Sequence, residues 1–180
     1  MFKKIIVALL FVISFLPASS AVAGSHGKTL SNLNNNDIMF AQMMIPHHQQ
    51  AIDMSKYALK NSSNREIKAL ATAISSAQGK EISQMKFWLT ATKSPATMGH
   101  HMDMNGMISE KQMKALSSLK GAKFDKAFLN AMIEHHQGAL EMVDLLKSTK
   151  NTEAKKLAKE IMRVQKAEIA SMKKLLVKIA

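Results

Sequence analysis

Two pairs of adjacent histidines, His47-His48 and His135-His136, occupy the same place in two nearly identical segments of the chain. Each pair begins a His-His-Gln-x-Ala motif, with Met-Ile shortly before it and a methionine after it. Duplicated core packing requires only apolar residues of similar size. Because this repeat also keeps imidazoles and thioethers at the same spacings, it indicates a chemical function such as metal binding. Such soft donors are typical of Cu(I) and Ag(I) sites, and imidazole also binds Cu(II).

The spacing of these donors places them on one side of a helix. Residues three, four and seven positions apart share a helix face, so Met44, His47 and Met54 form a stripe with His48 at its flank. The second copy repeats the pattern. The candidate metal ligands on the helices are Met44, His47, His48, Met54, Met132, His135, His136 and Met142. The alternative is structural, since methionine stripes usually pack cores and inward histidines are usually hydrogen-bonded core residues.

A second group of soft donors lies between the two motifs. The segment 98–107 contains four methionines, two histidines and two glycines, and it shows little helical or strand periodicity. Core packing does not explain this composition, so we expect metal binding there; the alternative is a chance low-complexity linker. The candidate ligands in this segment are Met98, His100, His101, Met102, Met104 and Met107.

The N-terminus resembles an export signal. Residues 1–23 combine two lysines, a short apolar stretch and small residues before the expected cleavage site. Cleavage there makes Gly24 the first residue and His26 the third, and the amine, amide and imidazole nitrogens of such an end suit square-planar Cu(II) or Ni(II). The alternative is a histidine in a disordered tail. We expect residues 24–36 to form a flexible lead and the protein to be periplasmic or secreted.

Composition excludes several kinds of site. The chain has 15 methionines and no cysteine, which removes disulfides, thiolate sites and blue-copper centres. Its formal net charge is +12, so it can contact anionic surfaces, but we expect no nucleic-acid partner and no stable membrane insertion. No Glu-x-x-His pair, His-Glu-x-x-His motif or phosphate-binding loop occurs, so we expect that the protein is not an enzyme.

Helical periodicity predicts an all-α fold. Long helices are expected over 37–60, 65–89, 125–147 and from 153 to the C-terminus, capped at their starts by Asp37, Asp125 and Thr152, with a short helix from the capping box at Ser109 to near Gly121. No segment shows the alternation of a strand.

The repeat continues beyond the histidine motifs. The motifs are 88 residues apart, and at an offset of 87 the helix that follows each motif also repeats, including Gln78, Glu81 and Met85. Each half is therefore a helix hairpin. Two hairpins that bury their apolar faces against each other form a four-helix bundle with internal pseudo-symmetry. The predicted single domain consists of a hairpin at 37–90, a connection with a short helix at 91–124 and a hairpin at 125–180.

The doubled His-His-Gln-x-Ala motif with its flanking methionines resembles a family of secreted ferritin-like proteins named as a domain of unknown function. The similarity extends from about Asp37 to the end of the chain. It implies a ferritin-like four-helix bundle, an exported location and, for some members, copper binding and copper resistance. Both copies of the motif fit the family, so the resemblance implies that all eight candidate ligands on the helices are candidate functional residues. The segment 98–107 rests on the ligand argument alone.

We therefore expect an exported copper-binding protein that sequesters Cu(I) or Cu(II), or hands it over, through methionine and histidine ligands. Silver is expected to mimic Cu(I), and the expected partners are metal ions and another copper-handling protein. The alternative is a basic, methionine-rich helical bundle that binds partner or unfolded proteins without metal. A copper-dependent oxidase would need an open redox site that nothing in the sequence requires.

Overall fold

The computed structural model describes residues 30, 32–98 and 104–179. The expected export signal and four of the predicted ligands, His26, His100, His101 and Met102, lie outside the described residues. Within the described part, the chain is helical and contains no strand. The predicted all-α class is confirmed.

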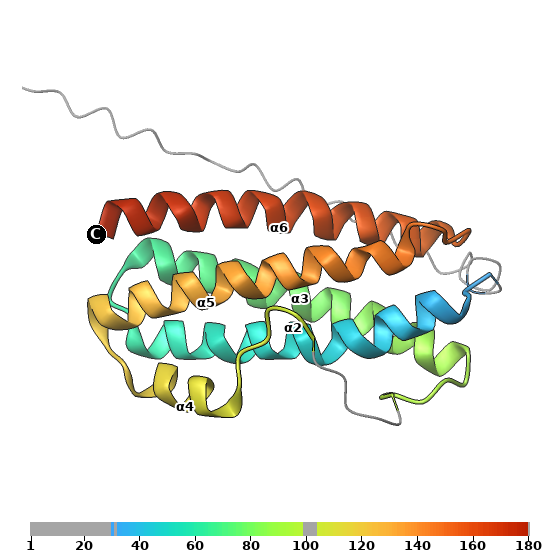
Figure 1. Ribbon diagram of the computed structural model, residues 1–180, viewed down its shortest axis with the longest axis horizontal. Coiled ribbons are helices and arrows are strands. Elements are labelled where there is room, and N and C mark those ends of the chain that lie inside the picture. Colours follow the sequence, from blue (N-terminus) through green and yellow to red (C-terminus); the bar gives the residue numbers. More distant parts are fainter. Residues whose placement is uncertain (1–29, 31, 99–103, 180) are drawn as a thin grey trace, which may run out of the picture.

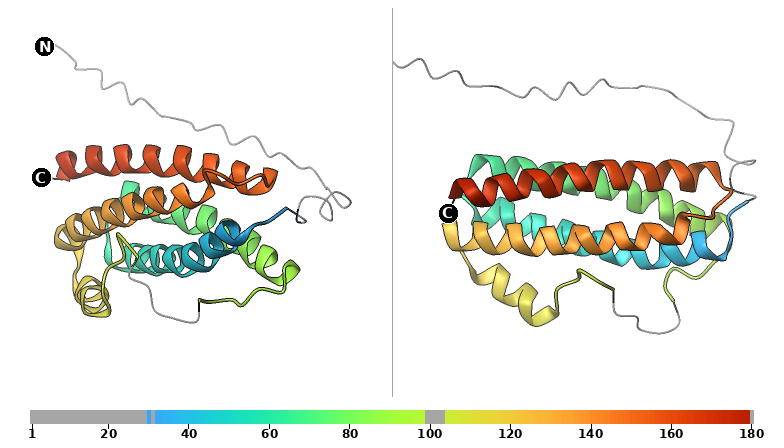
Figure 2. Two further views of the ribbon diagram at one scale, coloured as in Figure 1. Left: turned by 45° about the vertical axis from the view of Figure 1, so that its right-hand side comes forward. Right: turned by 45° about the horizontal axis from the view of Figure 1, so that its top comes forward.

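Four long helices run side by side as a bundle (Figure 1). They are α2 (Asn35–Asn61), α3 (Arg65–Ala91), α5 (Gly121–Met142) and α6 (Thr152–Ile179). α2 packs against α3 to form one hairpin, α5 packs against α6 to form the other, and α2 also contacts α5. The short helix α4 (Glu110–Ser118) lies outside the bundle, as both further views show (Figure 2). This arrangement confirms the predicted bundle of two hairpins.

Two of the predicted helix caps are displaced to neighbouring asparagines. Asn34, and not Asp37, caps α2, because its side chain accepts from the backbone N–H of Asp37 while the Asp37 carboxylate accepts from the N–H of Asn34. Asn151, and not Thr152, caps α6 by accepting from two backbone N–H groups at distances of 2.9 and 3.0 Å. Each asparagine leaves the neighbouring predicted cap inside the first turn of its helix.

The third long helix begins earlier and ends earlier than expected. α4 starts with the predicted capping box at Ser109 but ends at Ser118, and Gly121 begins α5 instead of ending the short helix. Gly121 has a φ of 54°, a conformation that glycine adopts without strain. Asp125 is therefore a residue of α5 and not its cap. After Met142 the chain tightens into a 3₁₀ turn, η1 (Val143–Leu146), so the α-helix stops before the expected end at Lys147.

The apolar core of the bundle is divided into two clusters. One contains the first turns of α2 and α6 and the last turns of α3 and α5; the other contains the later turns of α2 and the first turns of α3 and α5. Phe40, Trp88 and Ile161 represent the first cluster, and Ile74 and Phe128 the second. Because the start of α2 meets the end of α5, these two helices are antiparallel. Their histidine motifs therefore meet at the middle of the bundle.

Candidate metal centre

A layer of polar side chains, which we call the polar layer, separates the two core clusters. α2 and α5 each contribute a His-His pair, and α3 and α6 each contribute a glutamine followed three residues later by a glutamate. The members are His47, His48, Gln78, Glu81, His135, His136, Gln165 and Glu168, and each lies along its helix between residues of the two clusters. All four histidines are fully buried, and both glutamines are 2 % exposed.

The imidazoles of His47 and His135 lie against each other at the centre of the layer. Their ring centroids are 3.8 Å apart and their planes are tilted by 37°. The Nε2 atom of His135 is 2.9 Å from the carbonyl oxygen of His47, and the Nε2 atom of His47 is 3.2 Å from the carbonyl oxygen of Asn105. A carbonyl oxygen can only accept, so in both rings Nε2 carries the proton and donates it.

Burial keeps both central imidazoles neutral. Burial is the main cause that lowers the pKa of His47 from 6.5 to about 3; neighbouring His48 adds to the lowering, and the hydrogen bond to Asn105 opposes it. Burial, followed by the nearby imidazoles of His47 and His136, likewise holds the pKa of His135 well below its usual range. A neutral ring with its proton on Nε2 has its lone pair on Nδ1, and the neutral form is the one that binds a metal ion.

The outer imidazoles of the layer are paired with carboxylates. The Nε2 atom of His136 is 2.7 Å from Oε2 of Glu168 in α6. His48 approaches Glu81 of α3 in the same way, with 2.8 Å between Nε2 and Oε2, although the contact is not aligned as a hydrogen bond. Helical spacing predicts a flanking position for both histidines, but they are fully buried because these contacts place them under α3 and α6.

Every imidazole of the polar layer therefore turns Nε2 to an oxygen and leaves Nδ1 without a partner. The Nδ1 atoms of all four histidines are buried with no hydrogen-bond partner among the described residues. The side-chain amides of Gln78 and Gln165 are also buried, and neither their nitrogen nor their oxygen atoms have a partner in the part of the chain that the structure describes. Buried polar atoms in proteins are normally satisfied, so these groups require an explanation such as a bound ion. An imidazole held through one nitrogen by a carboxylate or carbonyl is the usual arrangement of a metal-ligating histidine.

Methionine sulfur flanks the polar layer on both sides. Each core cluster contains one buried methionine from α2, one from α5 and one from α3 or α6. The two sets are Met44, Met85 and Met142 on one side and Met54, Met132 and Met172 on the other, and all six are at most 7 % exposed. The structure therefore groups the predicted ligand Met44 with Met142 and not with its repeat equivalent Met132. This grouping follows from the antiparallel packing of α2 and α5.

The connection between the two hairpins contacts the polar layer through a backbone carbonyl group. Of its predicted ligands, the structure describes Met98, Met104 and Met107, and all three are partly buried. Met104 packs against the cluster at the start of α2, and the next residue, Asn105, accepts the hydrogen bond from His47.

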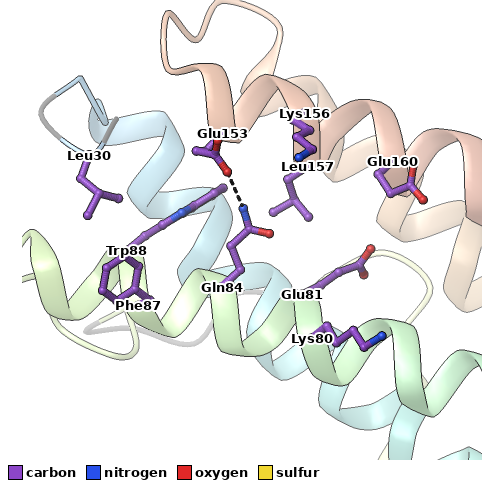
Figure 3. A pocket seen from close by; sticks show the side chains of 10 residues that line it. All are labelled: Leu30, Lys80, Glu81, Gln84, Phe87, Trp88, Glu153, Lys156, Leu157 and Glu160. Atoms are coloured by element: carbon purple, nitrogen blue, oxygen red, sulfur yellow. Dashed lines mark hydrogen bonds between the residues drawn. The ribbon is translucent and has the colours of Figure 1, made fainter. Parts of the chain in front are cut away.

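A groove lies between α3 and α6, and Glu81 of the polar layer is one of the residues that line it (Figure 3). Its volume is about 490 Å³, and Glu81, Gln84, Trp88, Glu153 and Leu157 are among the residues that line it. Gln84 donates a hydrogen bond of 3.5 Å to Glu153 across the groove. The Glu81 side chain is 13 % exposed, and its Oε2 atom lies 2.8 Å from Nε2 of the buried His48.

Sequence reasoning identified the repeat of Gln78 and Glu81 in Gln165 and Glu168 but did not assign these residues to the site. A pattern that points to them is present: Gln78 continues the apolar stripe of Ile67, Ala71 and Ile74 at helical spacing, and all four are buried. A polar residue on a buried stripe, repeated in the other half of the chain, indicates a functional layer. Within the described residues, no three His, Cys, Asp or Glu side chains form a metal cluster.

None of the helices in the described part of the chain is long and apolar enough to cross a membrane.

Comparison with known families identifies one that matches most of the chain. Residues 37–176 match the family described as a domain of unknown function, DUF305. Comparison with curated proteins gave no match.

Several solved structures are similar to this chain. A DUF305 protein of Streptomyces coelicolor, described as a presumed secreted protein, is 30% identical with a TM-score of 0.76, and the match covers 80% of this chain and 93% of that one. CopM in its Cu(I)-bound form is 38% identical with a TM-score of 0.68, covering 79% of this chain and 96% of CopM. CopM in its Cu(II)-bound form is also 38% identical, with a TM-score of 0.70 and coverage of 80% and 97%. CopM has a silver-bound form as well.

Proposed function

The chain belongs to the DUF305 family, and we propose that within it the protein is an exported copper-binding protein that sequesters copper or hands it over without catalysing a reaction. The observation that carries this proposal is the set of four buried imidazoles in the polar layer. Their Nε2 atoms face carbonyl or carboxylate oxygens, and their Nδ1 atoms have no partner. Four buried imidazoles that are held in this way at positions where apolar side chains would suffice for packing favour a metal-binding role over a packing role.

The kinds of donor favour copper and silver over harder ions. The polar layer offers neutral imidazole, and three buried thioethers lie on each side of it. Thioether is a soft ligand that selects Cu(I), whereas imidazole accepts both Cu(I) and Cu(II). The similarity to CopM, which has structures with Cu(I), Cu(II) and silver, supports the same choice. Met44, His47, His135 and Met142 are the first ligands to test, because they combine both donor types near the centre of the bundle.

The location of the methionines speaks against the alternative of a methionine-rich surface for partner proteins. That function requires adaptable thioethers at the surface, but the six methionines around the layer are at most 7 % exposed. The exposed large apolar residues in the described part of the chain are Leu59, Phe87 and Val177, none of them methionine. Export is supported by the pattern of residues 1–23 and by the similarity to a presumed secreted relative.

Competition titration tests this proposal. Metal-free protein without residues 1–23 would be titrated with Cu(I), Ag(I) and Zn(II) against chelators of known affinity, and the bound ions counted by native mass spectrometry. We expect Cu(I) and Ag(I) to bind more tightly than Zn(II), because thioethers favour soft ions and the chain has no thiolate. A Gln49→Ala variant, altered at an exposed residue of the same motif, is the matched control. Zinc binding as tight as that of Cu(I) would contradict the proposal.

A further inference from the structure

Residues 104–108 of the connection, which we call the strap, are hydrogen-bonded to both helices that carry the histidine motifs, α2 and α5. It crosses the α2–α5 pair near the middle of the bundle (Figure 1). The Gln50 side chain of α2 donates to the carbonyl oxygen of Ile108 at 2.8 Å and accepts from the N–H of Ile108 at 2.9 Å. On the other side, the Asn105 side chain donates to Glu141 of α5 at 2.7 Å.

The strap backbone rests directly on the backbone of α5. A Cβ atom on Gly138 would overlap the carbonyl group of Asn105 and would lie 2.9 Å from the nitrogen of Gly106. Gly106 has a φ of 81°, and a Cβ there would collide with the carbonyl oxygen of Glu134 and lie 3.0 Å from Cα of His135. Both glycines are therefore required for this close approach.

Gln50 and Gly138 occupy the same position of the two repeated motifs, the variable x of His-His-Gln-x-Ala. On α2 this position holds the strap by two hydrogen bonds, and on α5 it provides the space in which the strap lies. The difference between the two copies thus has one structural explanation. A single strap crosses a pseudo-symmetric pair of helices, and each helix meets it with a different residue.

The strap contacts the polar layer, because the carbonyl oxygen of Asn105 lies 3.2 Å from Nε2 of His47. We propose that Gln50 and Gly138 are positioning residues of the copper site: by seating the strap they hold the His47 imidazole with its proton on Nε2 and its lone pair on Nδ1. This inference rests on the proposed function for its copper ligand. The partner of Nε2 in a metal-ligating histidine sets the tautomer and orientation of the ring, and its loss typically weakens metal binding about 10- to 100-fold.

The test compares glycine variants that differ only in what the new methyl group meets. Gly138→Ala would drive the strap off α5, whereas Gly79→Ala, also in a helix, meets nothing within 4 Å and is the matched control. Long-range ¹H–¹⁵N NMR of the metal-free protein reports the His47 tautomer. We expect the Nε2–H form in the wild type and in Gly79→Ala, and a mixture of tautomers in Gly138→Ala. Cu(I) affinity should fall about 10- to 100-fold in Gly138→Ala alone.

A second pair of variants covers the case in which Gly138→Ala does not fold. Gln50→Ala removes both hydrogen bonds to Ile108, and Gln49→Ala removes an exposed neighbour that bonds only to Asp53 among the described side chains. Gln50→Ala should change the His47 tautomer and weaken Cu(I) binding, and Gln49→Ala should do neither. If Gly138→Ala or Gln50→Ala keeps both the tautomer and the affinity of the wild type, the positioning role is wrong. A wild-type protein that binds no copper overturns the proposed function, while the tautomer comparison still decides the role of the strap.

Discussion

Acid should destabilise the metal-free protein through its buried imidazoles, and the size of the effect follows from the pKa of His47. That pKa is lowered to about 3 in the folded chain, chiefly by burial, against a reference value of about 6.5 in an unfolded chain. Above pH 6.5 both states are neutral, and His47 contributes no pH dependence. Between pH 6.5 and pH 3 the unfolded chain binds a proton that the folded chain does not, so the free energy of unfolding falls as the pH falls.

The expected loss at pH 5 is about 2 kcal/mol for His47 alone. It is the product of about 1.5 pH units below the reference pKa and about 1.4 kcal/mol per unit. The pKa of His135 is also lowered, so His135 adds a loss of the same sign. Because small domains are stable by only about 5–15 kcal/mol, losses of this size are readily measured.

Urea unfolding of the metal-free protein at pH 7 and pH 5, followed by circular dichroism, measures the effect. His47→Gln is the matched variant, because its amide does not titrate in this range and can still donate to the carbonyl oxygen of Asn105. We expect the difference between the two pH values to be about 2 kcal/mol smaller in His47→Gln than in the wild type. Equal differences in the two proteins would refute the conclusion that His47 is buried and neutral.

Two further predictions concern the ligands. His47→Ala and His135→Ala should each weaken Cu(I) binding about tenfold or more while helicity is retained, because a ligand with an unpartnered Nδ1 adds little to folding; normal copper binding with a much lower melting temperature would identify both as structural residues. Changing Met98, Met102, Met104 and Met107 together should remove the copper held by the connection at pH 5, where exposed imidazoles are protonated. Copper should remain in the bundle at that pH, because His47 stays neutral. Comparison with a Met44 and Met132 double variant separates copper bound in the bundle from copper bound by the connection. A quadruple variant that loses no copper would identify the segment as a linker.

The helices could be predicted from the sequence because their apolar spacing is regular, and the starts at Arg65 and after Ser109 are confirmed, but several other helix ends could not be predicted. The segment 32–37 offers five residues that can cap a helix, namely four asparagines and Asp37. Asn34 is chosen because Asp37 then lies three residues later and completes a reciprocal pair of hydrogen bonds. Similarly, Asn151 and Thr152 are both good caps, and only the packed structure decides between them.

The candidate site was only partly predictable for a different reason. The four histidines were identified from their repeat, and all of them are buried in the polar layer. Their partners come from other helices, as Glu168 does for His136, or from the connection, as Asn105 does for His47. Such contacts depend on how the helices pack, and local spacing within one helix does not encode them.

The polar layer has a cost in stability that a purely structural role does not explain. Each buried polar group without a partner is destabilising by about 1–3 kcal/mol, and the layer contains four such Nδ1 atoms and two such amides. Apolar residues of similar volume would join the two core clusters into one, a replacement that is often neutral or stabilising in proteins. The repeat instead retains imidazoles, glutamines and glutamates at equivalent places in both halves. Residues that break the rules of core packing at equivalent places in both halves are expected where function requires them. Binding of a soft metal ion to the imidazole lone pairs would offset part of this cost.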